Sequence, residues 1–200
     1  MTKKAKTWTN PKDVSFLVST TAETAFQRAL FLSEGNRIEG IGFVEWLDLE
    51  LPVDRNRKGR GHCIDLIGRA ENKSMVICEL KFGKPGNGNP FDAQMQLEYY
   101  YSEVKENYDK LDEGNALHHK NALKQGEFKW EEIALPSTIR IIAANDDYWD
   151  YWRKKGSIPT SGSKCFTVPV STSLFKMQKE QSGNDRYTPS VDDFEWRLVK

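Results

Sequence analysis

Residues 62–82 read HCIDLIGRAENKSMVICELKF, and the expected architecture follows from them. Two runs rich in Ile, Val, Leu and Cys flank the polar break from Ala70 to Lys73, a pattern typical of a β-hairpin. Strands that pair symmetrically about a centre near Asn72 place Asp65 directly opposite Glu79. Such opposed residues have Cβ atoms about 5 Å apart, where like charges repel. The hairpin therefore brings two carboxylates together and needs something to offset their repulsion.

A divalent cation suits that role, because hard cations take carboxylate oxygens as ligands. Side chains alternate between the two faces of a strand, so Lys81 shares the face of Glu79 while Leu80 points away. Asp, Glu and Lys side chains then converge on one small patch of the sheet. The sequence thus predicts a cation site with an ammonium group beside it.

Ile64-Asp65, followed across the turn by Glu79-Leu80-Lys81, resembles the signature of the PD-(D/E)XK superfamily, the restriction-endonuclease-like phosphodiesterases. Ile64 stands where the family name has Pro. The resemblance covers about residues 21–101. It implies an α/β fold with a restriction-endonuclease-like core, a mixed central sheet flanked by helices in the order α-βββ-α-β. It also implies a metal-dependent nuclease that hydrolyses phosphodiester bonds, expected in DNA, and leaves a 5′-phosphate.

The resemblance assigns roles to the motif residues. Asp65, Glu79 and the backbone carbonyl of Leu80 would hold Mg²⁺, for which Mn²⁺ can substitute. Lys81 would orient the attacking water or stabilise charge on the phosphoryl oxygens. Asp65, Glu79 and Lys81 are accordingly the expected catalytic residues.

Related nucleases often carry one more acidic residue on the helix before the hairpin. A helix is expected to begin near Thr21 and to stop at Gly35, with an apolar stripe at helical spacing. Glu23 lies in its first turn and is the candidate for a third metal-site carboxylate. A Glu in the first turn also compensates the helix dipole, so that structural explanation stays open.

A strand is predicted from Ile41 to Val53, with Asp48 and Glu50 on one face and the apolar side chains on the other: Leu47, Leu49 and Leu51. Glu50 is the alternative third carboxylate. A solvated face of an antiparallel strand explains Glu50 without a metal.

Cations before and after the hairpin are candidate substrate contacts. Residues 55–61 combine two glycines with four basic side chains, in a loop that can lie along a phosphate backbone: Arg55, Arg57, Lys58 and Arg60. Simple solvation is the alternative explanation. Lys84 lies in the Gly- and Pro-rich segment 83–90, which is not a phosphate-binding P-loop because no Gly-Lys-Ser/Thr ends it.

Asn89 as N-cap and Pro90 at the first helical position are expected to open a long helix that ends near Leu111. Its apolar stripe has core spacing: Leu97, Tyr101, Val104, Tyr108 and Leu111. This helix follows the Glu79 strand directly, so it is placed to line the same site.

Gln96 and Tyr100 share another face of that helix at positions i and i+4. This Gln-x-x-x-Tyr pattern resembles the extra motif of the recombination-nuclease branch of the superfamily. It implies that Gln96 contacts a substrate phosphate and that Tyr100 stacks on or bonds to the strand. Gln94 is the alternative if the register shifts, and an ordinary amphipathic helix is the structural explanation.

The remaining chain is expected to add a buried strand, a helix, a strand, a polar loop and a final edge strand or helix: Thr138–Ala144, Asp146–Gly156, Cys165–Val170, Lys179–Pro189 and Phe194–Val199. No internal repeat or second domain is indicated, so residues 1–200 are expected to form one domain. Residues 1–12 are expected to be a flexible, solvated N-terminus; a phosphate-contacting arm is the alternative.

Composition narrows the expected partners. The chain has 29 basic and 29 acidic residues, which counts against avid non-specific nucleic-acid binding but allows a local basic patch. No apolar run approaches the roughly 18 residues of a membrane span, and the first residues lack the core of a secretion signal. Three cysteines without metal-type spacing suit a reducing compartment. We expect a cytoplasmic protein that does not contact membranes.

The expected partner is nucleic acid, with DNA favoured over RNA, and duplex cleavage by one small domain suggests a homodimer by analogy. A module of the same fold that binds nucleic acid or protein without cutting is the alternative function. A third possibility is that the hairpin is structural and that its charged residues form a surface ion-pair cluster.

Overall fold

The computed structural model describes residues 22–33, 35–53, 62–83, 88–119, 128–168, 175–179, 185–189 and 196–199. The expected N-terminal segment 1–12 lies outside these ranges. So do the candidate substrate-contacting cations, Arg55, Arg57, Lys58, Arg60 and Lys84.

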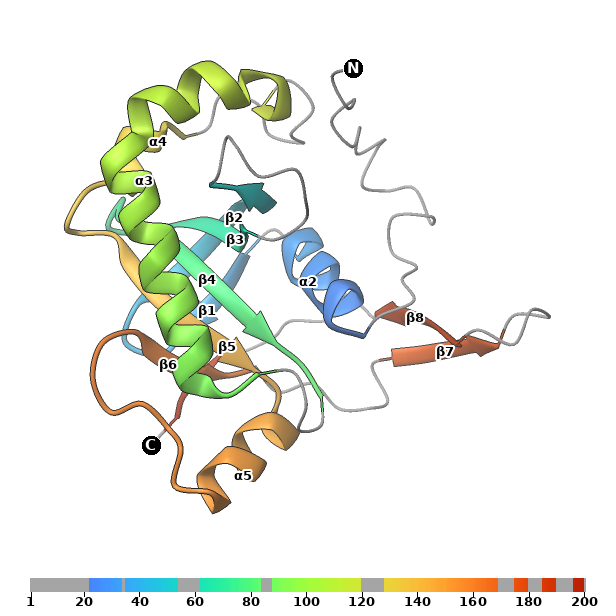
Figure 1. The fold of residues 1–200 in the computed structure, drawn as a ribbon. Helices are drawn as coiled ribbons and strands as arrows, with labels where there is room; N and C mark the ends of the chain where they lie inside the picture. Colours follow the sequence, from blue (N-terminus) through green and yellow to red (C-terminus); the bar gives the residue numbers. More distant parts are fainter. Residues whose placement is uncertain are drawn as a thin grey trace.

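A mixed seven-stranded sheet flanked by helices forms the centre of the molecule, which confirms the α/β class (Figure 1). The spatial order is β1 (Gly35–Ile38), β2 (Gly42–Pro52), β3 (Cys63–Ala70), β4 (Met75–Lys81), β5 (Ile139–Ala144), β6 (Lys164–Thr167) and β9 (Arg197–Leu198). Neighbours from β1 to β4 are antiparallel, β4, β5 and β6 run parallel, and β9 returns antiparallel to β6. The change from antiparallel to parallel pairing occurs at β4.

Two long helices cover opposite faces of the sheet and create two apolar clusters. Helix α2 (Ala22–Leu32) contributes Phe26 and Leu30 to one cluster. Helix α3 (Pro90–His119) crosses the other face (Figure 1) and contributes Leu97 and Val104 to the second cluster. Each face of the sheet is therefore buried under one helix, as a sheet in an α/β fold requires.

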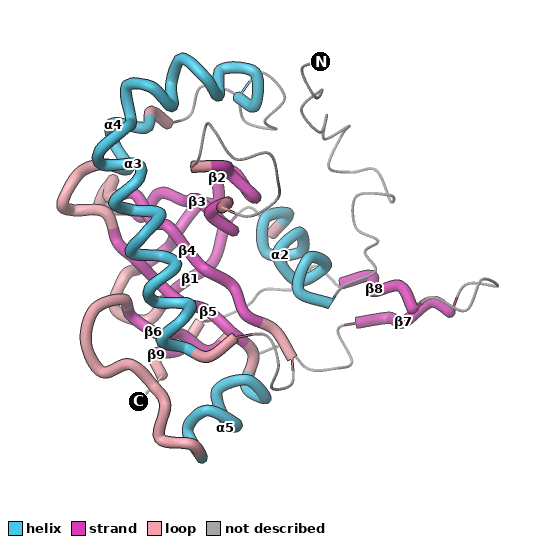
Figure 2. The backbone as a smooth tube through the Cα atoms, viewed as in Figure 1, coloured by secondary structure: helices cyan, strands magenta, loops and turns pink. Residues whose placement is uncertain are grey.

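Smaller elements complete the described fold. Helix α4 (Trp130–Ile133) precedes β5, and helix α5 (Asp146–Lys154) follows it. Strands β7 (Phe175–Lys179) and β8 (Asp185–Pro189) form a separate antiparallel pair, which Figure 2 shows apart from the main sheet. Within the described part of the chain, no helix has the length and apolar character needed to cross a bilayer.

The predicted hairpin is confirmed in its register. Strands β3 and β4 pair from Arg69 opposite Met75 to Leu66 opposite Cys78. The ladder ends at that pair, one residue short of the predicted pairing of Asp65 with Glu79.

The predicted alternation along β2 is wrong, because the strand contains a β-bulge. The register with β3 shifts between Trp46 and Asp48, so one extra residue, Leu47, enters the strand. Leu47 packs under α3, whereas Leu49 packs under α2. Asp48, expected on a solvated face, is buried with 6% of its surface exposed. Glu50 adopts a positive φ of 49°, a second backbone irregularity in β2 that the sequence does not predict.

Other boundaries also differ from the sequence prediction. Gly35 begins β1 instead of ending the helix, and a Cβ there would lie 2.5 Å from the carbonyl oxygen of Val44 on the paired strand. Helix α3 continues past Leu111 to His119, beyond a kink at Asn107. The segment Lys179–Pro189, expected as a loop, contains strand β8.

Asp48→Asn should stabilise the protein most at alkaline pH. Burial raises the pKa of Asp48 to about 7. Between about pH 4 and pH 7 the folded state therefore keeps a proton that the unfolded state releases. The free energy of unfolding falls as the pH rises through this range. Asn retains an acceptor for the Leu49 N–H, which Asp48 accepts at 2.8 Å. Thermal melts should show a gain of at least about 1 kcal/mol at pH 8, the worth of one pKa unit, and less at pH 4. Equal gains at both pH values would contradict this reading of Asp48.

Candidate active site

The site lies where β3 and β4 part. Their last recorded pair is Leu66 with Cys78, and β3 then continues along β2, with Ile64 opposite Leu51. Beyond that point the N–H of Leu80 donates to the Asp65 carboxylate at 2.7 Å. The Asp65 side chain thus lies between β3 and β4 just beyond the point where their pairing ends.

Glu79 and Lys81 form an ion pair beside that opening. Lys81 Nζ lies 2.5 Å from Glu79 Oε1, and the Glu79 side chain is almost fully buried. The second oxygen, Glu79 Oε2, is buried without a hydrogen-bond partner in the described structure. Buried polar atoms normally have a partner, so this oxygen is available to one from outside the described residues.

Glu23, not Glu50, lies beside these groups. Glu23 Oε2 accepts the N–H of Phe82, one residue after β4, at 3.2 Å. The charge of Glu23 acts on Asp65, Glu79 and Lys81. Glu50 instead interacts with Arg28 on α2. The packing of α2 therefore puts Glu23, and not Glu50, near the cluster; that Glu23 completes a metal site stays a prediction.

Burial raises the pKa values of all three carboxyl groups. Burial raises the pKa of Asp65 well above its usual range, and the charge of Glu79 adds to the shift. Burial likewise raises the pKa of Glu79 to about 7 and raises that of Glu23, in both cases against the opposing charge of Lys81. Burial alone would lower the pKa of Lys81, but the carboxylates outweigh it, Glu79 foremost, and raise that pKa. The metal-free cluster therefore holds protons to higher pH than free carboxyl groups do.

Helix α3 closes the site from the other side of the sheet. Gln96 Nε2 donates to the Tyr100 hydroxyl at 2.6 Å, and the pKa of Tyr100 is raised by burial and then by the charge of Glu79. Gln94 donates instead to the carbonyl of Ser161, at 2.9 Å. Gln96 is thus on the side of the carboxylates. The Tyr100 ring is 1% exposed, so it has no free face on which a nucleotide base can stack.

Two buried amides hold the site and were not identified from the sequence. Gln27 Nε2 donates to the backbone carbonyl of Asp65 at 2.6 Å, and Asn145 Oδ1 accepts the N–H of Gly83 at 3.0 Å. Gln27 follows Glu23 by four residues, so both lie on one face of α2, and this spacing is a signal that identifies it. Asn145 lies just after β5, and its contact with Gly83 depends on the parallel pairing of β4 with β5.

The donor set fits a magnesium-type ion better than a softer metal. In the described ranges no three His, Cys, Asp or Glu side chains stand close enough to grip an ion as they are. Mg²⁺ needs only one or two carboxylates and keeps several waters. Glu79 Oε2 and the Asp65 carboxylate can supply these two carboxylate ligands if the ion pair between Lys81 and Glu79 breaks. The backbone carbonyl of Leu80, which the resemblance implies as a metal ligand, belongs to β4, between Glu79 and Lys81.

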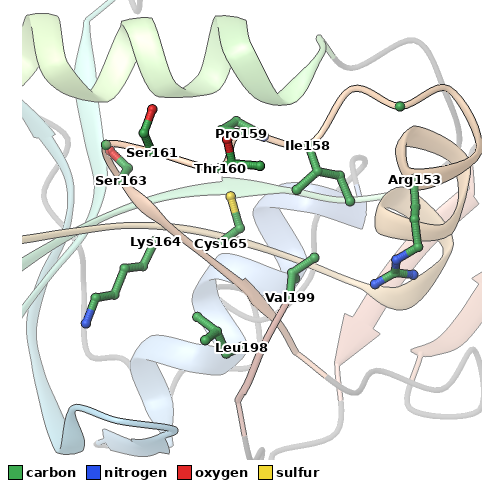
Figure 3. A pocket seen from close by; sticks show the side chains of 12 residues that line it. Arg153, Ile158, Pro159, Thr160, Ser161, Ser163, Lys164, Cys165, Leu198 and Val199 are labelled. Carbon is green, nitrogen blue, oxygen red and sulfur yellow. The ribbon is translucent and has the colours of Figure 1, made fainter.

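A cavity of about 520 Å³ lies elsewhere, near the β6–β9 edge of the sheet. Figure 3 shows the Cys165 sulfur beside Thr160, with Ile158 and Val199 along the same hollow. None of the predicted site residues lines this cavity. The carboxylate cluster and the cavity are therefore separate features.

Comparison of the chain with protein-family models, curated proteins and solved structures finds no match. The functional argument therefore rests on the residues themselves.

Asp65→Asn should stabilise the metal-free protein at pH 7.5. The raised pKa values of Asp65 and its neighbours mean that stability is lost as pH rises above the ordinary carboxyl range. Asn keeps an acceptor for the Leu80 N–H and removes one charge. We expect Tm in EDTA to rise by about 2–4 °C, which corresponds to about 1 kcal/mol, and the gain to shrink near pH 4.

The matched control is Glu106→Gln, an exposed position on α3 that should leave Tm unchanged. Mn²⁺ should raise the Tm of the wild type and not that of Asp65→Asn. A variant that is less stable than the wild type in EDTA would mean that Asp65 is a structural residue.

Proposed function

We propose that the chain is a metal-dependent nuclease of the PD-(D/E)XK, restriction-endonuclease-like type, which hydrolyses phosphodiester bonds in nucleic acid, with DNA as the expected substrate. The observation that carries the proposal is the buried cluster at the parting of β3 and β4. Glu23, Asp65 and Glu79 converge there around the single ammonium group of Lys81. So much buried negative charge is costly for stability, which is typical of a functional site.

The element order supports the same proposal. Helix α2 precedes the antiparallel strands β2, β3 and β4, and α3 then leads to β5, which pairs in parallel with β4. With β1 and α4 left out, this succession is compatible with the α-βββ-α-β order that the resemblance implies. The expected motif residues fall at the end of β4, where helices from both faces approach.

In the proposed mechanism Asp65 and Glu79 would hold a divalent ion, and Glu23 would add negative charge that favours its binding. Such an ion would supply polarisation of a phosphate oxygen and a lower pKa for a water molecule. Lys81, released from Glu79, orients the attacking water or stabilises charge on the phosphoryl oxygens. Gln96 positions the phosphate, since its amide already points to the site through Tyr100. The product carries a 5′-phosphate.

Two of the cysteines, Cys78 and Cys165, offer no competing nucleophile. Burial raises the pKa of Cys165 to about 11 and that of Cys78 well above its usual range, so both thiols stay protonated at neutral pH. All three cysteines are free thiols. The carboxylate cluster is thus the chemically active group that the structure favours.

A non-catalytic module of the same fold is the second candidate. The zero net charge of the chain favours a module that binds protein, because nucleic-acid binding usually shows a basic surface. The nuclease would cleave nucleic acid and require Asp65 to do so, whereas the non-catalytic module would not cleave it.

Wild-type protein should nick plasmid DNA or cut labelled single strands in Mg²⁺ or Mn²⁺ but not in EDTA. Asp65→Ala should lose at least about 100-fold in rate, because it removes a proposed metal ligand. Glu106→Ala, on the exposed side of α3, should cut at the wild-type rate. Equal rates for wild type and Asp65→Ala would contradict the nuclease proposal. If Mn²⁺ binds without any cleavage of either DNA, the non-catalytic module becomes the better description.

Lys81→Met should bind Mn²⁺ more tightly while losing cleavage. In the metal-free protein the Lys81 ammonium group forms an ion pair with the Glu79 carboxylate. An uncharged side chain of similar length removes this cation, which competes with Mn²⁺ for Glu79. Calorimetry should show an affinity at least about tenfold higher, which is about 1.4 kcal/mol. The metal-free variant should be less stable, because a buried charge has lost its partner.

The control for this comparison is Lys105→Met, an exposed position on α3. It should change neither Mn²⁺ affinity nor cleavage. Weaker Mn²⁺ binding by Lys81→Met would show that the ammonium group supports the metal site instead of competing for it.

A further inference from the structure

The pairing of β3 is interrupted on both sides of Asp65. Towards β4, the last recorded pair is Leu66 with Cys78. Towards β2, recorded pairs flank Asp65, but none of them joins it to Glu50, whose φ is 49°. The regular ladder that fixes a residue in the middle of a sheet is therefore broken at this position.

A side chain from α2 holds the main chain at this interruption. Gln27 Nε2 donates to the backbone carbonyl of Asp65 at 2.6 Å, and only 4% of the Gln27 surface is exposed. The two residues are 38 positions apart in the chain, so the bond forms only when α2 is docked on the sheet. Removal of the amide would take a hydrogen bond from a carbonyl close to the buried carboxylates.

The Asp65 side chain is held by a different element. Its Oδ2 accepts the N–H of Leu80, on β4, at 2.7 Å. Four residues before Gln27, on the same face of α2, Glu23 accepts the N–H of Phe82 at 3.2 Å. One face of α2 therefore spans the parting of the strands, with Gln27 bonded to β3 and Glu23 bonded just beyond the end of β4.

The relative position of the two proposed metal ligands depends on these bonds. Asp65 belongs to β3 and Glu79 to β4, and no recorded pair joins the strands at that point. An ion of the magnesium type tolerates little variation in the positions of its ligands. Groups that orient a metal ligand without touching the metal commonly determine how tightly the metal binds.

We propose that Gln27 is a positioning residue of the carboxylate site. Through the Asp65 carbonyl it fixes β3 relative to β4, so that Asp65 and Glu79 can bind one divalent ion together. The inference rests on the proposed metal-dependent function and names a residue that sets the metal affinity of that site. Gln27 contacts neither the ion nor the nucleic acid and acts only through the main chain of Asp65.

The test is calorimetric titration of Mn²⁺ into the folded protein, which requires no substrate. Gln27→Met keeps the length of the side chain and removes the donor. It should weaken Mn²⁺ binding about tenfold to a hundredfold, the usual effect of losing a group that orients a metal ligand. Gln27→Asn is one methylene shorter but keeps an amide that can bond through water. It should weaken binding in the same direction, and it decides the test if Gln27→Met does not fold.

Gln94→Met is the matched control. Gln94 also donates its amide to a backbone carbonyl, that of Ser161, which lines the separate cavity. This variant should bind Mn²⁺ like the wild type. Folded Gln27 variants with wild-type Mn²⁺ affinity would overturn the proposal, and so would an equal loss of affinity in Gln94→Met.

The Mn²⁺ dependence of cleavage gives a second measurement. A higher Mn²⁺ concentration should restore the cleavage rate of Gln27→Met, because its ligands are displaced but present. The same concentration should not restore Asp65→Ala, which lacks a ligand. A cleavage defect in Gln27→Met that does not depend on Mn²⁺ concentration would contradict the positioning role.

The outcomes separate this proposal from the nuclease itself. Cleavage that requires Asp65, with unchanged Mn²⁺ affinity in the Gln27 variants, would reject only the positioning role. Weaker Mn²⁺ binding in those variants, without cleavage of DNA by the wild type, would reject only the nuclease. A wild type that binds no Mn²⁺ would reject both.

Discussion

The parting of β3 from β4 at Asp65 is the constraint on which the rest of the site depends. An unbroken antiparallel ladder would fix two carboxylates against each other and fill the space between the strands with backbone hydrogen bonds. Here β3 follows β2, and the N–H of Leu80 bonds to the Asp65 side chain. The backbone donor stays satisfied while the carboxylate gains a fixed position in the opening. Glu79, Lys81 and the first turn of α2 can then approach the same point from β4 and from the helix.

The part of the site that lies on one hairpin could be predicted from the sequence. Apolar runs on both sides of a short polar turn define the register, and the register fixes which side chains meet. The third carboxylate could only be narrowed to Glu23 or Glu50, because the choice depends on how α2 packs against the sheet. Gln27 and Asn145 were missed for the same reason, since each acts through a contact with a distant backbone group.

The failures along β2 have a local cause with a large effect. Side chains in a strand alternate with a period of two, so an inserted residue changes the face that its neighbours occupy. Together with the positive φ of Glu50, the bulge separates Leu49, under α2, from Leu47 and Leu51, under α3. Leu47 is the inserted residue, and an apolar side chain at a bulge looks no different in sequence from one in a regular strand. Gly35 was predicted to end the helix because glycine is common after helices. In the structure it begins β1 and permits the close approach of β1 and β2.

The hairpin also sets the order in which the site is assembled as the chain folds. The turn between β3 and β4 is short, with Lys73 in the left-handed region at a φ of 68°, so this pairing closes at low entropic cost. The parallel pairing of β4 with β5 must wait until the chain has passed through α3. Asp65 and Glu79 therefore meet while water still screens them. Their repulsion grows when α2 and α3 dock and exclude that water, so helix docking should be the folding step whose rate responds most to protons.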